Sequence, residues 1–381
     1  MRIAVNTRLV MPGRMDGMGW FAFETTRRLV ADHPEHRFLL LFDRPCTPPA
    51  GDRSWDFLHA PNVEVKVLCP PTRHPLLWML YFELSLPAAL RHWKADLYLT
   101  PDGMMPRHPH VPTLTVIHDI NYEHAADNLR RSHQCYMTHF FPRFARAAAR
   151  VATVSEYSRQ DIAATYGVDP ARIDVVYDGA HARYRPHTAD EQAATRQRFT
   201  GGAPYLIFVS TILRRKNLTG LLKAFDMVKE SHDGPLKLLV VGNRFWWGDE
   251  LKEAYDAMRH RDDVIFIGRA DPADLSALLS SSEMLVYPSF FEGFGIPILE
   301  AMYAETAVVC SNTTSMPEVG GDAVLYADPA SPTDIADAIG RILADPSLRD
   351  SLIERGRTQR QLYSWQRTTD LLWESVMKVV K

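Results

Sequence analysis

The sequence predicts an α/β protein made of two doubly wound domains that face each other across a central cleft. Three observations lead to this prediction. The chain has 381 residues, more than one hydrophobic core normally serves. Short apolar runs alternate with amphipathic segments, and this alternation is typical of parallel sheets covered by helices on both faces. The alternation restarts near residue 203, which indicates a second domain.

The apolar runs are short enough to be buried strands. In the first half they lie at 2–5 (RIAV), 37–42 (RFLLLF), 63–68 (VEVKVL), 96–100 (DLYLT) and 113–119 (TLTVIHD). In the second half they lie at 205–210 (YLIFVS), 236–242 (LKLLVVG), 264–268 (VIFIG), 284–288 (MLVYP), 307–311 (AVVCS) and 323–327 (AVLYA). Amphipathic helices are predicted between them, for example at 218–230 and 271–282.

A polar stretch at 185–204, which ends in the sequence GGAP, separates the two halves. This composition is typical of an interdomain link. We therefore expect an N-terminal domain over 1–200 and a C-terminal domain over 201–364. The last segment, 365–381, has the pattern of an amphipathic helix with no strand after it, and we expect it to pack back on the first domain.

Composition and charge argue against several classes of protein. The formal net charge of −3 gives no reason to expect nucleic acid as a partner. The four cysteines show no CxxC spacing, so neither zinc nor a disulfide framework is expected. The chain starts with a strand pattern instead of a signal peptide, and no run reaches the roughly 18 apolar residues of a spanning helix. We expect a cytoplasmic protein.

Ligands of doubly wound sheets bind beyond the carboxyl ends of the strands, so each functional motif should follow a strand. The first candidate is the segment from Gly17 to Thr25 (GMGWFAFET). With Asp43 after the next strand, it is the best case for a nicotinamide-dependent oxidoreductase. However, a long loop separates Val5 from Gly17, whereas fingerprint glycines follow their strand at once. We interpret the segment as a loop leading into a helix whose N-terminus binds anionic groups, with a plain turn as the alternative.

Two polar side chains, His118 and Asp119, close the predicted strand 113–119. At the carboxyl end of a strand they should point to the cleft, where they could bond a substrate or transfer protons. An Asp that caps a helix and a His with a structural hydrogen bond would give the same pattern, so both interpretations stay open.

Three adjacent cations, Arg214, Arg215 and Lys216, lie between the predicted strand 205–210 and a helix that begins at Leu218. Cations at this end oppose the helix dipole. We therefore expect an anion to compensate them, and a phosphate or diphosphate is the obvious candidate. Neither GxxxxGKS nor GxxxxGKT occurs, so phosphoryl transfer from ATP loses support.

The densest group of candidates is the loop 290–296 (FFEGFGI) and the helix start that follows it. Glu292 lies just before the helix and Glu300 just inside it, so both can approach one pocket at the helix N-terminus. Gly293 and Gly295 permit backbone conformations that bring amides close to a ligand. Carboxylates accept hydrogen bonds from vicinal hydroxyls, which a sugar ring or a ribose offers. Two acidic residues that satisfy helix amides are the plainer alternative.

These residues resemble glycosyltransferase family 4, whose members are retaining nucleotide-sugar transferases with the GT-B architecture of two Rossmann-like domains. The sequence FEGFGIPILEAM at 291–302 is similar to that family's Glu-x7-Glu signature. The segment 17–25 looks like its N-terminal glycine loop, and TVIHD at 115–119 looks like its histidine segment. The segment 209–225 (VSTILRRKNLTGLLKAF) resembles its diphosphate-binding segment, so the resemblance covers nearly the whole chain.

The resemblance implies a role for each matched position. Arg215 and Lys216 should hold the donor diphosphate, Glu292 the transferred sugar and Glu300 the nucleotide ribose, and His118 should lie beside the reacting sugar. His118, Glu292, Lys216 and Arg215 are therefore the implied catalytic residues. The wider donor site is implied to include Gly19, Ser210, Thr211, Ile267, Gly268, Gly293, Phe294, Gly295 and Ile296, and substrate orientation to involve Trp20 and Asp119. Many members carry Gly-Thr or Gly-Arg where this chain has Ser210-Thr211.

The resemblance also implies the reaction. A hexose would move from a nucleoside diphosphate sugar to a hydroxyl of a saccharide or lipid-linked saccharide, with retention, in the assembly of cell-surface polysaccharide or glycolipid. Negative charge grows on the departing diphosphate, and Arg215, Lys216 and the helix dipole would stabilise it without a metal. No Asp-x-Asp motif occurs in the sequence, and no cofactor besides the donor substrate is expected.

Two other hypotheses stand beside the transferase. One is the oxidoreductase that would use Gly17, Gly19 and Asp43. The other is a sugar-binding protein that kept the fold and lost turnover.

Two further segments each allow two interpretations. The apolar and aromatic stretch 74–93 ends in cations, and we interpret it as a pair of core helices. The alternative is a lipid-facing surface at the inner face of a membrane. Trp246 and Trp247 could equally stack on a base or sugar or pack in the core.

Overall fold

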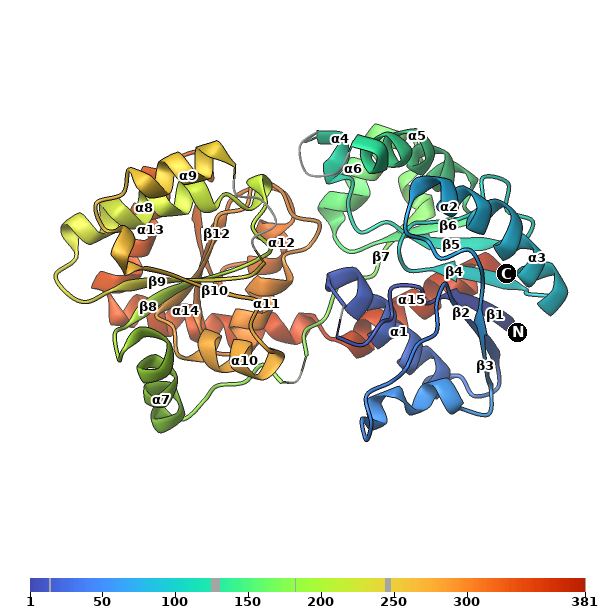
Figure 1. Cartoon of the computed structure of the whole chain (residues 1–381), viewed down its shortest axis with the longest axis horizontal. Coiled ribbons are helices and arrows are strands. Elements are labelled where there is room, and N and C mark those ends of the chain that lie inside the picture. The colour runs from blue at the N-terminus through green and yellow to red at the C-terminus, as the bar shows by residue number, and fades with distance from the viewer. Residues whose placement is uncertain (14, 125–130, 182, 244–247, 381) are drawn as a thin grey trace. The chain divides into compact units, whose positions relative to one another are not determined.

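The computed structural model describes the chain except for residues 14, 125–130, 182, 244–247 and 381. It divides into two compact units, one formed by Met1–Gly179 and Trp365–Lys381 and the other by Ala180–Ser364. Each unit has a parallel sheet with helices on both faces (Figure 1), so the predicted doubly wound α/β class is confirmed. None of the helices in the described part of the chain is long and apolar enough to cross a membrane.

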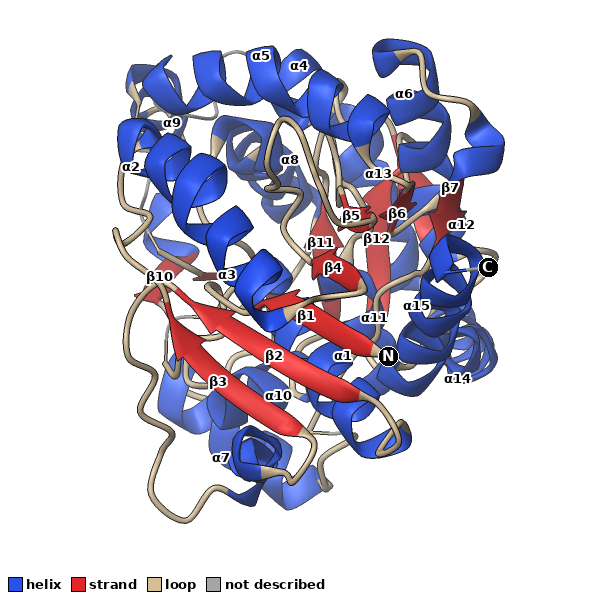
Figure 2. Cartoon of the chain, turned by 90° about the vertical axis from the view of Figure 1, so that its right-hand side faces the viewer, coloured by secondary structure: helices blue, strands red, loops and turns tan. Residues whose placement is uncertain are grey.

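The sheet of the first unit has the strand order β3-β2-β1-β4-β5-β6-β7, and the strand pairs are parallel. Figure 2 shows β1, β2 and β3 side by side at one end of this sheet. The strands are β1 (Arg2–Asn6), β2 (Arg37–Phe42), β3 (Val63–Val67), β4 (Leu97–Thr100), β5 (Thr113–Val116), β6 (Arg150–Thr153) and β7 (Ile173–Val175). Strands β6 and β7 were not predicted, because Arg150 in β6 and Asp174 in β7 interrupt short apolar runs.

The helices of the first unit cover both faces of this sheet. They are α1 (Gly17–Asp32), α2 (Pro75–Leu80), α3 (Leu86–Trp93), α4 (Asn121–His124), α5 (Arg131–Ala147), α6 (Glu156–Tyr166) and α15 (Trp365–Val380), with a π-helical turn η2 (Tyr81–Ser85) and 3-10 turns η1 (Arg53–His59) and η4 (Pro170–Arg172). Helix α15 packs against α1 and contacts β5 and β6. The ring of Trp373 stacks on that of His33, with 3.6 Å between centroids.

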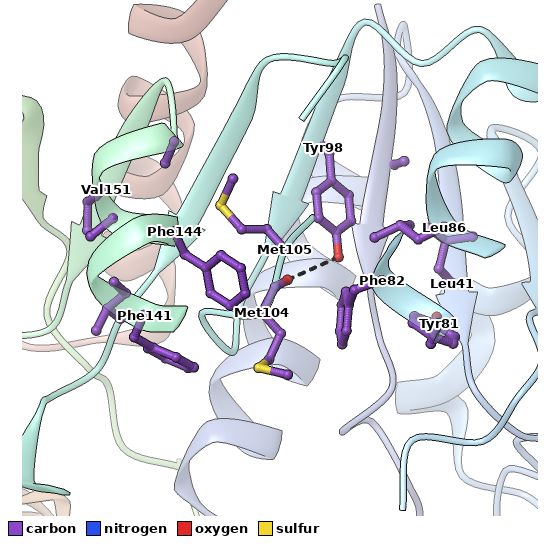
Figure 3. Close-up of a cluster of buried hydrophobic side chains, with 14 of the residues drawn as sticks. Leu41, Tyr81, Phe82, Leu86, Tyr98, Met104, Met105, Phe141, Phe144 and Val151 are labelled. Carbon is purple, nitrogen blue, oxygen red and sulfur yellow. Dashed lines mark hydrogen bonds between the residues drawn. The ribbon is translucent and has the colours of Figure 1, made fainter. Parts of the chain in front are cut away.

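Large apolar side chains fill the core between this sheet and the helices α3 and α5 (Figure 3). Tyr81 and Phe82 of η2 lie beside Leu86 of α3, and Phe141 and Phe144 come from α5. The hydroxyl of Tyr98 in β4 donates a hydrogen bond to the Met104 carbonyl at 3.4 Å. This packing holds the segment after β4 against the helices that cover the sheet.

The sheet of the second unit has the strand order β10-β9-β8-β11-β12-β13, again with parallel pairs. Its strands are β8 (Tyr205–Val209), β9 (Lys237–Val241), β10 (Val264–Gly268), β11 (Met284–Tyr287), β12 (Ala307–Ser311) and β13 (Leu325–Ala327). Its helices are α7 (Ala189–Thr200), α8 (Leu218–Ser231), α9 (Asp249–Asp256), α10 (Pro272–Ser280), α11 (Ile296–Tyr303), α12 (Met316–Gly320), α13 (Pro332–Ala344) and α14 (Pro346–Gln359), with 3-10 turns η5 (Arg214–Lys216), η6 (Arg261–Asp263) and η7 (Arg360–Leu362).

The predicted domain boundary at residue 200 is wrong by about twenty residues, because the break between the units falls after Gly179. Most of the supposed linker is helix α7, which begins at a capping box formed by Thr188 and Glu191. This helix packs on α10 of the second unit. Arg196 of α7 also donates a hydrogen bond to the Ser281 carbonyl at 2.8 Å. The capping box, Thr-x-x-Glu, is the sequence signal that identifies this helix start.

Candidate functional site

The strand order of the second unit reverses between β8 and β11. Ligands of doubly wound sheets bind at such a switch point, beyond the carboxyl ends of the strands. The loop after β8 leads into the basic turn, and the loop after β11 contains Glu292. Most of the residues predicted to bind the donor therefore come from the two loops that meet at this point.

The three cations of the basic turn form η5, which precedes α8. Asn217, at φ 57°, is the N-cap of α8 and accepts a hydrogen bond from the Gly220 amide. Its side-chain amide donates to the carbonyls of Pro288 at 3.0 Å and Pro329 at 2.7 Å. Asn217 was not among the residues predicted from the sequence. The cations lie just outside the helix, and Asn217 fixes their turn against the loop after β11.

Arg215 and Lys216 share the carboxylate of Glu292. The Nζ atom of Lys216 lies 2.5 Å from Oε1 of Glu292 and also donates to the Tyr287 hydroxyl at 2.8 Å. The Nη1 atom of Arg215 lies 3.2 Å from Oε2 of Glu292 and donates to the Phe291 carbonyl at 2.8 Å. Only 9% of the Lys216 side chain and 8% of the Glu292 side chain are exposed, so this ion pair is almost fully withdrawn from solvent.

Glu292 stays ionised in this cluster. Burial by itself would raise the pKa of this carboxyl, but the charges of Lys216 and Arg215 outweigh burial and hold the pKa at about 2. The two cations and one carboxylate together carry one net positive charge. Hydrogen bonds between ionised groups of this kind are strong away from water, so the cluster is suited to hold an anion.

The loop around Glu292 is held in place by α12 and the turn before it. The Glu292 amide donates to the Thr314 hydroxyl at 3.2 Å, and the Ser315 hydroxyl donates to the carbonyls of Glu292 and Phe294, both at 2.9 Å. The Phe294 ring is buried against Tyr363, with 5.4 Å between centroids, so this side chain helps to pack the loop.

Gly293, Gly295 and Ile296 end the same loop. Gly295 has φ 105°, a conformation that other residues resist. It is the N-cap of α11, and Ile296 and Pro297 form the first turn of that helix. Gly293 is buried directly before Phe294.

Glu300 lies in α11, one turn beyond Pro297, and forms a hydrogen bond with the hydroxyl of Tyr184. Burial raises the pKa of this carboxyl to about 7, while the Tyr184 hydrogen bond and the charge of Arg183 oppose the rise. Glu300 therefore titrates near neutral pH, in contrast to Glu292. Tyr184 was not predicted from the sequence.

The remaining predicted donor residues line the carboxyl ends of β8 and β10. Ser210 and Thr211 follow β8, and the Ser210 amide donates to the Val241 carbonyl at 3.0 Å. Ile267 is the extra residue of a β-bulge, because its neighbours Phe266 and Gly268 pair with successive residues of β9. A bulge redirects the side chain that it carries, which is common beside binding sites.

Gly242 allows these strand ends to lie close together. A Cβ atom on Gly242 would lie 1.8 Å from the Ser210 carbonyl oxygen, and its φ is 146°. Its amide donates to the Gly268 carbonyl at 2.7 Å. Gly242 was not predicted from the sequence, because a single glycine after a strand is also common in ordinary turns.

In the first unit, His118 follows β5 and its Nε2 atom lies 2.9 Å from the Pro101 carbonyl oxygen. A carbonyl only accepts, so Nε2 carries the proton. Burial lowers the pKa of His118, although the hydrogen bond to Pro101 opposes this. The ring is therefore neutral at pH 7, with its second nitrogen as an acceptor. Phe21 fixes the ring edge-on at 4.8 Å between centroids.

Gly19, Trp20 and Asp119 lie at helix starts of the same unit. The Gly19 amide donates to the N-cap carboxylate of Asp16 at 3.0 Å, and Trp20 packs edge-on to Phe23. Asp119 accepts from the Asn121 backbone amide at 3.0 Å. Capping is thus the observed local role of Asp119, which was one of the two interpretations of its position.

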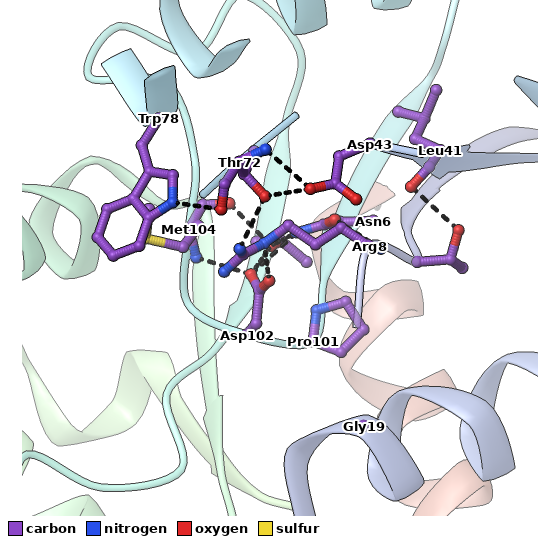
Figure 4. A network of polar contacts seen from close by, with 12 residues as sticks. Asn6, Arg8, Gly19, Leu41, Asp43, Thr72, Trp78, Pro101, Asp102 and Met104 are labelled. Carbon is purple, nitrogen blue, oxygen red and sulfur yellow. Dashed lines mark hydrogen bonds and ion pairs between the residues drawn. The ribbon is translucent and has the colours of Figure 1, made fainter. Parts of the chain in front are cut away.

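The switch point of the first unit lies between β1 and β4 and contains a polar network that the sequence analysis missed (Figure 4). Asp102 accepts from Asn6 at 2.9 Å, from Arg8 Nε at 2.5 Å and from the Met104 amide at 3.1 Å. Arg8 also donates to the Thr72 hydroxyl at 3.2 Å.

Asp43 belongs to this network and not to a dinucleotide site. Its two oxygens accept from Arg44 at 2.7 Å each, and Oδ2 also accepts from the Thr72 amide at 2.8 Å. Its side chain is fully buried. The carboxylate that the oxidoreductase hypothesis needs for a ribose is thus occupied by protein donors.

Trp246 and Trp247 lie outside the described residues, so both interpretations of them stay predictions. Within the described ranges, no three His, Cys, Asp or Glu side chains gather in a way that could hold a metal ion.

Comparisons with known proteins agree with this geometry. A family model described as "Glycosyltransferase Family 4" matches residues 15–183, and one described as "Glycosyl transferases group 1" matches 190–359. The O-antigen chain mannosyltransferase B of Escherichia coli is 32% identical over 282 residues, which is 74% of each chain. This chain belongs to glycosyltransferase family 4. The O-antigen chain mannosyltransferase RfbU of Salmonella typhimurium is 26% identical over 71% of each chain.

Solved structures show the same fold. A sucrose-phosphate synthase from Thermosynechococcus elongatus has a TM-score of 0.75 at 19% identity and covers 100% of this chain and 99% of its own. The Anabaena protein HepE, in complex with UDP and glucose, has a TM-score of 0.74 at 17% identity over 99% of each chain. This family 4 glycosyltransferase thus has the GT-B fold that its motifs implied.

Proposed function

We propose that this glycosyltransferase moves a hexose from a nucleoside diphosphate sugar to an acceptor hydroxyl, with retention of the anomeric configuration. The observation that carries the proposal is the buried cluster of Arg215, Lys216 and Glu292 at the switch point of the second unit. Its net positive charge and its position beyond β8 and β11 suit a diphosphate.

In the proposed donor complex, Arg215 and Lys216 bind the diphosphate. Its negative charge then compensates the two cations in place of the Glu292 carboxylate. The carboxylate of Glu292 then accepts hydrogen bonds from hydroxyls of the transferred sugar. The amides of Gly293, Gly295 and Ile296 lie beside it. Glu300 accepts from the ribose hydroxyls in its ionised form.

The outer parts of the donor contact the remaining predicted residues. Ser210 and Thr211 border the diphosphate, while Ile267 and Gly268 border the base. In the first unit, Gly19 belongs to the donor side, His118 accepts a hydrogen bond from the sugar, and Trp20 and Asp119 orient the substrate. These roles rest on the matched family positions.

The reaction breaks the bond between the anomeric carbon and the diphosphate oxygen. The acceptor oxygen forms its bond to the same carbon on the same face, and its proton passes to the departing diphosphate. The transition state resembles an oxocarbenium ion. Arg215 and Lys216 stabilise the charge that develops on the leaving group, and this role requires no metal ion.

The acceptor in this proposal is a saccharide or lipid-linked saccharide, used in polysaccharide assembly at the cytoplasmic face of a membrane. Support comes from the two O-antigen chain mannosyltransferases among the relatives. The oxidoreductase is not favoured, because Asp43 is bound by Arg44 and Thr72.

A donor screen tests the proposal. The protein is incubated with a panel of UDP-, GDP- and deoxynucleoside diphosphate sugars with and without a chelator, and products are identified by mass spectrometry. We expect hydrolysis or transfer from one donor class, unaffected by the chelator, and an anomeric signal in NMR that matches the donor. Single-turnover analysis distinguishes a non-catalytic sugar-binding protein, which would bind a donor and release it intact.

A further inference from the structure

Helix α2, turn η2 and helix α3 form one continuous helical run over 75–93 (Figure 2). One side of this run packs into the core of the first unit. The other side exposes Leu76, Leu80 and Leu84, with 66%, 48% and 63% of their surface accessible. Residues four apart lie on one face of a helix, so these side chains form a single row, called here the leucine stripe.

The leucine stripe differs from ordinary scattered surface leucines. Among the described residues nine large hydrophobic side chains are exposed, and three of them belong to this one row. A contiguous apolar surface of this kind marks an interaction site more often than isolated exposed side chains do.

Cations flank the stripe at both ends of the run. Arg73 precedes it, and Arg91 and Lys94 follow it, all three exposed. The one acidic residue within 73–94 is Glu83. Its carboxylate accepts a hydrogen bond from Arg107 at 3.0 Å, so it carries no net negative charge to the surface.

The neighbouring helix α5 extends the same charge pattern. Helices α2 and α5 are in contact, and the ring of Trp78 stacks on that of His133 with 5.0 Å between centroids. Helix α5 has no acidic residue, and its exposed cations are Arg131, Arg143 and Arg146. In a chain with a net charge of −3, exposed cations therefore lie at both ends of the aliphatic row and on the helix that contacts α2.

We propose that the leucine stripe and its flanking cations bind the surface of a bilayer that contains anionic lipid headgroups. The leucines would enter the boundary between headgroups and acyl chains, and the long cationic side chains would reach the phosphates. A protein partner fits less well, because the centres of protein interfaces favour aromatic residues and exclude lysine. The exposed row is purely aliphatic, and a lysine lies at its end.

Vesicle flotation of the full chain tests this proposal. Vesicles of phosphatidylcholine mixed with phosphatidylglycerol are compared with phosphatidylcholine alone, at low and high salt. We expect flotation with the mixed vesicles, little with the neutral ones, and a decrease with salt.

Two triple variants separate the parts of the surface. The variant Leu76→Gln/Leu80→Gln/Leu84→Gln should lower the partition coefficient at least about tenfold. The variant Arg73→Gln/Arg91→Gln/Lys94→Gln should lower it by about fivefold for each cation. All six side chains are exposed, so circular dichroism and the melting temperature should stay as in the wild type.

Matched controls come from exposed positions of the second unit. The variant Met227→Gln/Leu362→Gln removes apolar side chains that are 42% and 48% exposed, and Lys252→Gln/Arg259→Gln removes two cations. Both controls should float like the wild type.

Three results would overturn the proposal: a wild-type chain that stays with the aqueous phase, a stripe variant that floats like the wild type, or binding that is equal on neutral vesicles. Analytical ultracentrifugation adds a fourth. A dimer that the stripe variant dissociates, without vesicle binding, would assign this face to a second copy of the chain.

Discussion

The switch points of the two sheets both hold cations against buried carboxylates, but they are built differently. In the first unit, Asp102 and Asp43 are matched one to one by Arg8 and Arg44, and threonine and backbone donors complete their hydrogen bonds. In the second unit, Arg215 and Lys216 share the one carboxylate of Glu292. Groups of cations and carboxylates at the switch points of the two sheets can therefore have different functions.

The difference shows how to tell structure from function in such networks. A balanced, fully hydrogen-bonded network fixes the loops that it joins, so a substitution in it should lower the unfolding free energy. A cluster with an excess of positive charge is suited to bind a further anion, so a substitution in it should weaken ligand binding. Substitutions on either side of this contrast can test it.

The largest effect is expected for Lys216→Ala. The variant removes the cation that should stabilise the leaving diphosphate, so kcat/KM should fall about a thousandfold. Arg215 still pairs with Glu292, so the melting temperature should change little. Steady-state kinetics with the donor found in the screen measure the effect. Lys216→Arg, which keeps the charge, should retain more activity, and equal losses in both variants would count against a charge role.

The next effect concerns the first unit. Asp102→Ala leaves Arg8 buried without its carboxylate, which should cost about 3–5 kcal/mol of unfolding free energy. Chemical denaturation measures it, and affinity for a nucleoside diphosphate should stay unchanged. A loss of affinity as large as that of Lys216→Ala would erase the contrast between the units.

Gly242→Ala tests the close approach of β8, β9 and β10. The new methyl group would collide with the Ser210 carbonyl, so we expect a loss of about 2 kcal/mol or more. The matched control is Gly167→Ala, at φ 64° with no atom within 4 Å of its Cβ position, where about 1 kcal/mol is expected. Thermal unfolding of both variants decides it, and equal losses would contradict a steric role for Gly242.

The pH dependence of donor binding tests Glu300. Its pKa is raised to about 7, and the proposed ribose contact needs the ionised form, so affinity should be about tenfold lower at pH 6 than at pH 8. Stability should change in the opposite direction. A raised folded pKa favours the protonated native state, so the unfolding free energy should decrease as pH rises through 7. Glu300→Gln should make both profiles flatter, and an unchanged profile in that variant would assign the dependence to another group.

The smallest effect is expected for Tyr184→Phe. Its hydroxyl lowers the pKa of Glu300, so removing it should move the midpoint of the binding profile to higher pH by less than about one unit. Calorimetric titration at several pH values measures the midpoint. A shift to lower pH would mean that the hydroxyl does not act on the ionised carboxylate.

The features of this protein that could be predicted from the sequence are those whose signal lies within one short segment. The apolar runs that became β1 to β5 and β8 to β13 stand out, because helices bury both faces of most of these strands. The pair Glu292 and Glu300 stands out because its spacing around glycines and a proline is readable within one segment. By contrast, the runs of β6 and β7 are interrupted by Arg150 and Asp174, which weakens their apolar pattern.

The parts that sequence missed depend on contacts between distant segments. Asn6, Thr72 and Asp102 are far apart in the chain and meet only because β1 and β4 are neighbours. Asp43 was a candidate of the oxidoreductase hypothesis for the same reason, since its partner Thr72 lies 29 residues away. Tyr184 likewise reaches Glu300 only in the folded unit. Helix α7 was missed for a different reason. Its capping box, Thr188 and Glu191, is visible in the sequence, but the polar composition of the segment was interpreted as a linker.

The most direct measurement of the central claim compares nucleoside diphosphate with monophosphate binding. Calorimetric titrations with UDP and UMP, and with GDP and GMP, give the contribution of the second phosphate. We expect the wild type to bind the diphosphate of one base about a hundredfold more tightly than the monophosphate, and Lys216→Ala to bind both nearly equally with the monophosphate affinity preserved. A preference for the diphosphate that survives in Lys216→Ala would contradict the proposed anion site.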